Sequence, residues 1–176
     1  MNDSHLVDHS IIRSLQPQDI DLLGKLSFPW ATLEETIKKW QGYFEEQSKG
    51  DRLACIIEYQ NAIIGYGSLL RNSEYPQFQN KHIPEVNDVW IDECYRKNGL
   101  GARLITHIEK LAKAECYHEI GLGVGLFREY GPAQRLYFQL GYKPDGEGIT
   151  YKHVTAIPWE KYSLDDDLIL WLTKPL

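Results

Sequence analysis

The sequence predicts a mixed α/β domain with one central strand–helix–strand unit, and three observations lead to this class. The spacing of apolar residues changes along the chain between the alternation typical of strands and the three- and four-residue steps typical of helices. Two β-rich runs, 53–59 and 62–70, are separated only by Gln60 and Asn61, which suits a hairpin in which Asn61 takes a positive φ. A glycine-containing stretch at 96–102 joins a short apolar run to an amphipathic helix.

Seven runs in the sequence are expected to form strands. In chain order they are 10–15, 53–59, 62–70, 86–91, 118–124, 148–155 and 167–173. The runs at 86–91 and 118–124 are expected to lie parallel, because a helix long enough for a crossover connects them. The polar segment 71–83 contains Pro76 and is expected to be a loop.

Four segments carry the signals of helices. A short helix is expected to open at Pro17. Thr32 and Glu35 have the spacing of a capping box, and apolar residues recur at helical spacing after them. The fourth helix, 133–140, is bracketed by a proline and a glycine. The third follows the glycine-containing stretch and places its apolar residues on one face: Leu100, Leu104, Ile105, Ile108, Leu111 and Ala112.

Composition limits the classes of function. The chain has 176 residues, 43% hydrophobic and 25% charged, which fits one globular domain, 1–176, with a single substantial core. Its formal charge of −6 argues against nucleic acid as a partner, since binding to a phosphate backbone relies on clustered Lys and Arg. No window approaches the roughly 18 apolar residues of a membrane span, and the first residues lack the basic and apolar regions of a signal peptide. We therefore expect no membrane partner and a cytoplasmic location, and a homodimer stays open.

Histidine and cysteine show no metal-ligand pattern. The histidines have no spacing typical of a metal site, and Cys55, Cys94 and Cys116 form no CxxC pair. We expect no metal, and we expect the three thiols to be buried. Cys94 lies close to the glycine-containing stretch, so a route through an acyl-cysteine stays open as an alternative.

The stretch at 96–102 has the form of a phosphate-binding loop. A helix N-terminus presents backbone N–H groups without intrahelical partners and the positive end of the helix dipole, so it favours an anion. Gly99 and Gly101 let the backbone approach a pyrophosphate without a Cβ in the way. The pattern Arg-x-x-Gly-x-Gly-Ala at 96–102, with Ala-x-x-Leu-Tyr-x-x-x-Gly-Tyr at 133–142, resembles the two principal motifs of the Gcn5-related N-acetyltransferase (GNAT) superfamily.

This resemblance extends over about 10–173 and implies both a fold and an activity. The fold is a central mixed β-sheet of about seven strands flanked by four helices, in which the strands before and after the glycine loop's helix splay apart and hold acyl-CoA. The activity is transfer of an acetyl group from acetyl-CoA to a primary amine by direct attack. Acetyl-CoA is then the co-substrate, and the partner is a small-molecule or peptide amine.

The resemblance also implies which residues bind acetyl-CoA. Backbone N–H groups of the glycine loop take the pyrophosphate, and pantetheine runs beside the strand around 89–91. An N–H at Trp90 or Ile91 then polarises the thioester carbonyl. Many relatives carry Asn three residues before the alanine of the second motif, where this chain has Tyr130. The implied cofactor-binding residues are Val89, Trp90, Ile91, Arg96, Lys97, Asn98, Gly99, Leu100, Gly101, Ala102 and Tyr130.

Three residues are candidates for catalysis. Tyr137 matches the tyrosine that protonates the CoA sulfur in many relatives, and a phenol of pKa about 10 stays protonated beside a thiolate whose pKa is roughly 8.5. Without the resemblance, Tyr137 is an aromatic residue on an apolar helix face. Glu85 precedes Gly99 at the spacing of the basic glutamate in histone acetyltransferases of the superfamily. Asp88 is its rival, and strand alternation places it on the opposite face, although both carboxylates also fit a solvated strand end.

Two alternative functions and the acceptor stay open. A dinucleotide-binding protein also has a glycine loop after a strand, but Leu104 stands where its third glycine is needed. A non-catalytic acyl-CoA sensor of the same fold has the same pocket. The acceptor amine is not specified by any motif. Four aromatic residues before or near the fourth expected strand are predicted to line an acceptor cleft or to pack in the core: Phe28, Trp30, Trp40 and Tyr75.

Overall fold

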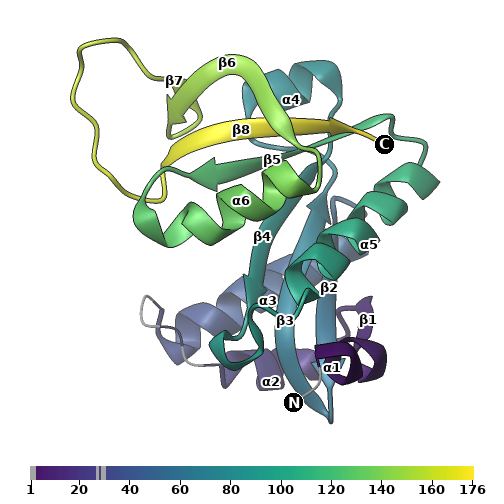
Figure 1. Ribbon diagram of the computed structural model, residues 1–176. Coiled ribbons are helices and arrows are strands. Elements are labelled where there is room, and N and C mark those ends of the chain that lie inside the picture. The colour runs from purple at the N-terminus through teal and green to yellow at the C-terminus, as the bar shows by residue number, and fades with distance from the viewer. Residues whose placement is uncertain (1–2, 27, 29–30) are drawn as a thin grey trace. The chain divides into compact units, whose positions relative to one another are not determined.

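A computed structural model of the protein describes residues 3–26, 28 and 31–176 (Figure 1). The described residues form a mixed α/β fold, as the sequence predicts. The helices are α1 (Asp3–His9), α2 (Ile20–Gly24), α3 (Leu33–Lys49), α4 (Pro76–Lys81), α5 (Leu100–Ala114) and α6 (Gly131–Gln139), with 3-10 turns η1 (Pro17–Asp19), η2 (Glu93–Tyr95) and η3 (Arg128–Tyr130). The strands are β1 (Ile11–Ser14), β2 (Arg52–Tyr59), β3 (Ala62–Leu70), β4 (Glu85–Ile91), β5 (Glu119–Gly125), β6 (Lys143–Tyr151), β7 (Val154–Thr155) and β8 (Leu168–Pro175). None of the helices in these ranges is long and apolar enough to cross a membrane.

The strands form a mixed sheet with the order β1-β2-β3-β4-β5-β8-β6-β7. Glu85 of β4 pairs in parallel with Gly121 of β5, and α5 is the crossover between these strands. The pairs β1–β2, β2–β3, β5–β8, β6–β8 and β6–β7 are antiparallel. The predicted parallel pair around the central helix is therefore confirmed.

Contacts divide the chain into two compact units, each made of two segments. Unit 1 comprises Met1–Leu70 and Asp88–Ile108, and unit 2 comprises Arg71–Asn87 and Glu109–Leu176. Strand β4 and helix α5 each contribute residues to both units. The single domain expected from the chain length stays a prediction.

Unit 1 packs helices on a sheet of β1, β2, β3 and the second half of β4. In Figure 1, α3 and α5 lie on opposite faces of these strands. On the α5 face, a Cβ added to Gly67 would lie 3.1 Å from Leu104 Cδ2, so the helix packs directly on the strand backbone. The buried cluster on the other face consists of Leu15, Leu23, Phe28, Trp40, Ala54, Ile56, Ile63 and Tyr66.

Unit 2 is built on β5, β8, β6 and β7, with an aromatic cluster beneath α4. The rings of Tyr75 and Trp171 stack with centroids 4.2 Å apart, and Phe78 meets Trp171 edge-on at 5.3 Å. Trp171 Nε1 donates to Thr150 Oγ1 at 2.8 Å, which satisfies the one polar atom of this buried indole. The segment between β3 and β4 is thus part of the core of this unit.

Several local sequence signals form the structures they predict. Thr32 Oγ1 accepts the N–H of Glu35 at 3.2 Å, and the Glu35 carboxylate accepts the N–H of Thr32 at 2.8 Å, which completes the capping box of α3. Gln60 and Asn61 have φ angles of +50° and +63°, so the β2–β3 hairpin turns through two left-handed residues. Pro132 lies in the first turn of α6. These features depend on neighbouring residues alone.

Three expectations about elements are wrong. Segment 71–83 contains helix α4, which Pro76 starts at a first-turn position where its missing N–H costs no hydrogen bond. The expected strand at 148–155 is instead the hairpin β6–β7, which turns through Lys152 and His153 at φ +51° and +61°. The described residues contain six α-helices and eight strands, rather than four helices and about seven strands, because α1, α4 and β7 are too short for a clear period.

Candidate active site

The turn η2 and the glycine loop connect β4 to α5. Asp92 accepts the N–H of Cys94 at 2.9 Å and so caps the turn η2. The chain then passes through Lys97 and Gly99, whose φ angles are +66° and +78°. Helix α5 begins at the next residue, and Gly99 O accepts the N–H of Arg103 at 3.0 Å. The N–H groups before Arg103 in this first turn have no intrahelical acceptor and are available to an anion.

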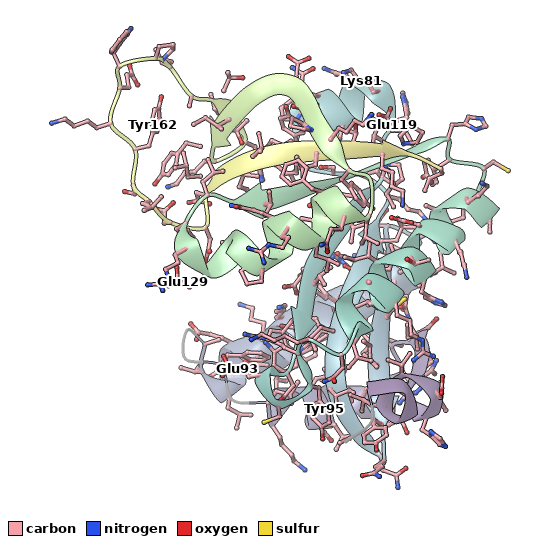
Figure 2. The ribbon with its side chains drawn as sticks, in the orientation of Figure 1. Lys81, Glu93, Tyr95, Glu119, Glu129 and Tyr162 are labelled. Carbon is pink, nitrogen blue, oxygen red and sulfur yellow. The ribbon has the colours of Figure 1, made fainter. Side chains whose placement is uncertain are left out.

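Two side chains of the loop brace its backbone. Arg96 Nε donates to Ile91 O at 2.9 Å, and Arg96 Nη1 lies 3.4 Å from Glu93 Oε1. Asn98 Nδ2 donates to the carbonyl oxygens of Tyr95 at 3.0 Å and Arg96 at 3.1 Å. Glu93 and Tyr95 are labelled on this segment in Figure 2. The loop therefore has a shape defined by its own side chains, while the phosphate contact of Arg96 stays a prediction.

Gly99 provides the open approach that a pyrophosphate requires. A Cβ added at this residue would have no other atom within 4 Å, and the φ of +78° lies in the left-handed region that favours glycine. Backbone groups at the helix start can therefore be approached closely by a bulky anion. This geometry fits the pyrophosphate of acetyl-CoA, with Gly101 and Ala102 in the first turn of α5.

The second half of β4 is packed on both faces. A Cβ added to Gly65 would lie 2.7 Å from Ile91 Cδ1, and one added to Gly67 would lie 3.3 Å from Val89 Cγ2. The Trp90 ring instead stacks on Tyr66, with centroids 5.2 Å apart and planes at 22°. Side chains of this segment are thus used for packing, which leaves its backbone groups as the part that can serve a ligand.

Asp88 interrupts the regular geometry of β4. Its φ is +53°, a conformation that is uncommon for a residue other than glycine. Lys39 Nζ lies 2.6 Å from Asp88 Oδ2, and Tyr43 Oη donates to the same oxygen at 3.1 Å. Both partners come from α3. The regular alternation of side chains between the two faces of the strand is therefore interrupted at Asp88. Alternation was the reason to expect Asp88 on the face opposite Glu85.

Glu85 is a buried carboxylate with hydrogen bonds to both oxygens. Its exposed fraction is 6%. Ser73 Oγ donates to Oε2 at 2.5 Å, and Asn87 Nδ2 donates to Oε1 at 2.8 Å. Buried carboxylates need such donors because the charged form is otherwise costly away from water. The structure thus places Glu85 in a polar network rather than at a solvated strand end.

Tyr137 lies on α6, half-buried beside Tyr142. The two ring centroids are 6.2 Å apart, and Tyr137 O accepts the N–H of Tyr142 at 3.1 Å. Burial raises the pKa of Tyr137 to about 12, so the phenol keeps its proton at neutral pH. Tyr130 precedes the first residue of α6, and its Oη donates to Asp166 Oδ1 at 2.9 Å.

The sequence also matches a known protein family over this region. The family model of the acetyltransferase (GNAT) family matches residues 18–142, which is more than half of the chain and includes both the glycine loop and Tyr137. The chain belongs to the GNAT acetyltransferase family. A search of curated proteins finds no match to the sequence.

Solved structures share the GNAT fold over nearly the whole chain. An aminoglycoside 6'-acetyltransferase type Ii has a TM-score of 0.67 at 21% identity, covering 94% of this chain and 96% of its own. A ribosomal-protein-S5-alanine acetyltransferase from Vibrio fischeri has a TM-score of 0.66 at 17% identity, covering 95% and 93%. A GNAT acetyltransferase from Elizabethkingia anophelis, solved with acetyl-CoA bound, has a TM-score of 0.60 at 18% identity, covering 96% and 99%. These likenesses show the fold, and together with the family match they support an acyltransferase function.

The predicted site residues of this GNAT protein are divided between the two units. Unit 1 holds Asp88, the β4 residues 89–91 and the glycine loop 96–102, which Arg96 links to Ile91 O. Unit 2 holds Glu85, Tyr130 and Tyr137. The splayed strand pair that the resemblance implies stays a prediction.

Four residues around the candidate carboxylates were not found by sequence analysis. Lys39 and Tyr43 contact Asp88, and Ser73 and Asn87 contact Glu85. Lys39 lies next to the apolar position Trp40, whose helical period signals core packing rather than a site. No sequence signal marks Ser73 or Asn87, because their role depends on the fold around β4.

Other predictions about this GNAT chain are settled in part. Phe28 and Trp40 are buried in the unit 1 cluster, and Tyr75 is buried in unit 2. All three therefore contribute to cores, and the acceptor cleft stays a prediction. Trp30 lies outside the described residues. The expectation of buried thiols holds for Cys55 and is wrong for Cys94 and Cys116, which are exposed: Cys94 lies on the surface turn η2, and Cys116 follows the end of α5.

Proposed function

We propose that the protein transfers an acetyl group from acetyl-CoA to a primary amine by direct attack of the amine. The observation that carries this proposal is the geometry at Gly99, in a chain of the GNAT family. This glycine has a left-handed φ, leaves open space in place of a Cβ, and is followed at once by the N-terminus of α5. A helix start with this approach suits the pyrophosphate of CoA.

The proposed cofactor site uses backbone groups. First-turn N–H groups of α5, including those of Gly101 and Ala102, hold the pyrophosphate with the help of the helix dipole. Backbone groups at 89–91 pair with the pantetheine arm, and the N–H of Trp90 or Ile91 stabilises negative charge on the carbonyl oxygen. When bound, acetyl-CoA supplies the thioester from which the acetyl group is taken.

Tyr137 is proposed as the donor to the departing sulfur. Its pKa of about 12 keeps the proton on Oη throughout the neutral range. Because a thiol has a pKa of roughly 8.5, complete proton transfer to the thiolate is uphill, and the larger effect of Tyr137 is a hydrogen bond to the developing charge. The family motif supports this role.

Glu85 is proposed as the group that accepts the proton of the amine. An alkylammonium of pKa near 10 must lose a proton before it can attack. The hydrogen bonds from Ser73 and Asn87 orient the carboxylate. Asp88 is the rival for this role, because it also lies on β4.

The proposal is tested by assaying CoA thiol release from acetyl-CoA with a panel of amines. The acceptors of the structural neighbours suggest two members of the panel, an aminoglycoside and a peptide with N-terminal alanine. A polyamine, an amino acid and a buffer blank complete it. We expect thiol release that depends on the amine and an acetylated product detected by mass spectrometry.

The same assay separates an enzyme from a non-catalytic sensor. Acetyl-CoA binding measured by calorimetry, without thiol release for any amine, would indicate a sensor of the same fold. Thiol release that is independent of the amine would indicate hydrolysis. Absence of acetyl-CoA binding would overturn the assignment of the glycine loop.

A further inference from the structure

The ammonium group of Lys39 sits among three aromatic rings and a carboxylate. Its Nζ lies 5.4 Å from the ring centroid of Trp40, 5.5 Å from that of Tyr43 and 5.1 Å from that of Tyr66. The same atom lies 2.6 Å from Asp88 Oδ2. All three rings are within the range in which a ring face attracts a cation. We call Trp40, Tyr43, Tyr66 and Asp88 the ammonium cage, and all four residues belong to unit 1.

The three rings of the cage are positioned by contacts that do not involve Lys39. Trp40 and Tyr66 are 1% and 3% exposed, and their rings meet edge-on with centroids 4.7 Å apart. The ring of Tyr43 also packs edge-on against Trp40 at 5.4 Å, and its Oη is bonded to Asp88. The cage is therefore a preformed arrangement of rings around one carboxylate.

Asp88 is presented to the cage in an unusual way. Its left-handed φ of +53° is a conformation that residues other than glycine rarely adopt, and such outliers concentrate at functional sites. Lys39 and Tyr43 both bond to Oδ2, whereas Oδ1 accepts no hydrogen bond from any residue that the structure describes. A guest with several N–H donors can therefore use both oxygens.

The ammonium group of Lys39 can be displaced from the cage by another cation. The Lys39 side chain is 34% exposed, and that of Asp88 is 29% exposed, so solvent reaches this pair. The ammonium is carried on a flexible stem from α3, and a partly exposed ion pair of this kind is only weakly stabilising. Trp90, whose backbone N–H is a candidate for polarising the thioester, follows Asp88 by two positions on β4.

We propose that the ammonium cage is the binding site for the acceptor, that it selects a primary alkylammonium group, and that Lys39 fills it in the absence of substrate. This inference rests on the proposed function in taking the acceptor as a primary amine. The rings favour a cation over a neutral group, and Asp88 favours a cation that donates hydrogen bonds over a quaternary one. Lys39 acts as an intramolecular competitor that the substrate must displace.

The test is an NMR titration with n-propylammonium chloride that follows the indole N–H signal of Trp40. Tetramethylammonium and n-propanol are titrated in parallel, and acetyl-CoA is left out. The variants are Lys39→Met, which keeps an apolar stem, and Lys38→Met, which removes the same charge from the neighbouring exposed position of α3. A competitor that fills the cage about nine-tenths of the time weakens apparent binding about tenfold, so Lys39→Met should bind about tenfold more tightly.

The remaining variants define the outcome. Lys38→Met should bind as the unchanged protein does, and Asp88→Asn in the Lys39→Met background should lose about tenfold or more. Two results would contradict the proposal that the cage binds an alkylammonium in competition with Lys39. One is equal affinity of Lys39→Met and Lys38→Met for n-propylammonium, and the other is equal binding of n-propanol and n-propylammonium. Because acetyl-CoA is absent, cage binding is measured even where acetyl transfer fails. Normal transfer with an unchanged KM in Lys39→Met would overturn the cage and leave the proposed function standing.

Discussion

Two carboxylates, Glu85 and Asp88, lie close together in the sequence of β4 but have different surroundings. Glu85 is buried, and its hydrogen-bond donors include Ser73 and Asn87. Asp88 contacts an ammonium group and has a left-handed backbone. A buried carboxylate that hydrogen bonds hold in place suits a proton acceptor, whereas an ion pair among aromatic rings suits a binding residue. We therefore expect the two residues to affect different kinetic constants.

Glu85→Gln should lower kcat by about 10²–10⁴-fold with an accepted amine, because it removes the proposed general base. Asp88→Asn should mainly raise KM. Ser73→Ala is the matched control, since it removes a hydrogen bond to the same carboxylate and keeps the base. Steady-state kinetics over a range of pH, with thermal melts to verify folding, measure these effects. The opposite ranking of kcat would assign proton removal to Asp88.

Tyr137→Phe should retain acetyl-CoA affinity and lose turnover by about 10²–10⁴-fold, because the ring still packs and only the donor is removed. Tyr142→Phe is the control, since its ring lies beside that of Tyr137. With a pKa of about 12, Tyr137 stays protonated up to about pH 11, so it should cause no alkaline loss of kcat below that pH. Full turnover in Tyr137→Phe would make Tyr137 a packing residue.

At the scale of elements, the glycine loop and the first turn of helix α5 together form the proposed phosphate site. Gly99→Ala should weaken acetyl-CoA binding about tenfold in calorimetry, because its methyl group fills the open approach to the helix start. The left-handed φ should also cost about 1–2 kcal/mol of stability. Gly50→Ala is the matched control: this residue has φ +83° at the end of α3 and equally open space. It should lose similar stability and no affinity. Equal affinity in both variants would exclude Gly99 from the phosphate site.

An ion pair between a part-exposed arginine and a buried aspartate joins β1 to the turn η1. Arg13 donates to both oxygens of Asp19, at 2.7 and 2.8 Å, and the Asp19 side chain is 1% exposed. Burial alone would raise the pKa of Asp19, but the hydrogen bonds from Arg13 and from the N–H of Gln16 lower it below its ordinary value. A lowered pKa contributes stability above the unfolded-state value of about 3.9, and this contribution disappears as the pH falls through the folded-state value.

Asp19→Asn should therefore destabilise the protein by on the order of 1–3 kcal/mol near pH 7, since it removes one of the two carboxylates that Arg13 contacts and leaves Glu58 as the other. Denaturant unfolding at several pH values measures the effect. The difference between Asp19→Asn and the unchanged protein should shrink as the pH is lowered below about 4. A difference that is constant with pH would mean that the carboxylate charge makes no contribution.

At the scale of the whole molecule, ligand binding should appear as stability. Acetyl-CoA at 100 times its Kd should add about 2.7 kcal/mol. For a chain of this length, that corresponds to a rise in Tm of roughly 5–10 °C, measurable by differential scanning fluorimetry. NAD should give no rise, because the loop lacks the third glycine of a dinucleotide site. An equal rise with NAD would reopen the dinucleotide-binding alternative.

Local patterns in the sequence were sufficient for the fold class and for the glycine loop. The capping box at Thr32, the turn at Asn61 and the glycine at position 99 each depend on residues within a few positions. The parallel pair of β4 and β5 follows from the helix between them. The same patterns failed for α4 and the β6–β7 hairpin, where short elements carry too few residues for a period to be recognised.

The sequence by itself determined that this chain is an α/β protein of the GNAT family in which a glycine loop leads into a helix. Only the tertiary structure decided what surrounds the two carboxylates. Tyr43 and Asp88 are 45 positions apart in the sequence, and Ser73 and Glu85 are 12 apart. No local sequence pattern therefore predicts the hydrogen bonds between them. The physical reason is that a turn or cap is stabilised by its own neighbours, whereas the cage around Asp88 exists only because α3 packs on the sheet and brings Lys39 and three rings to one strand.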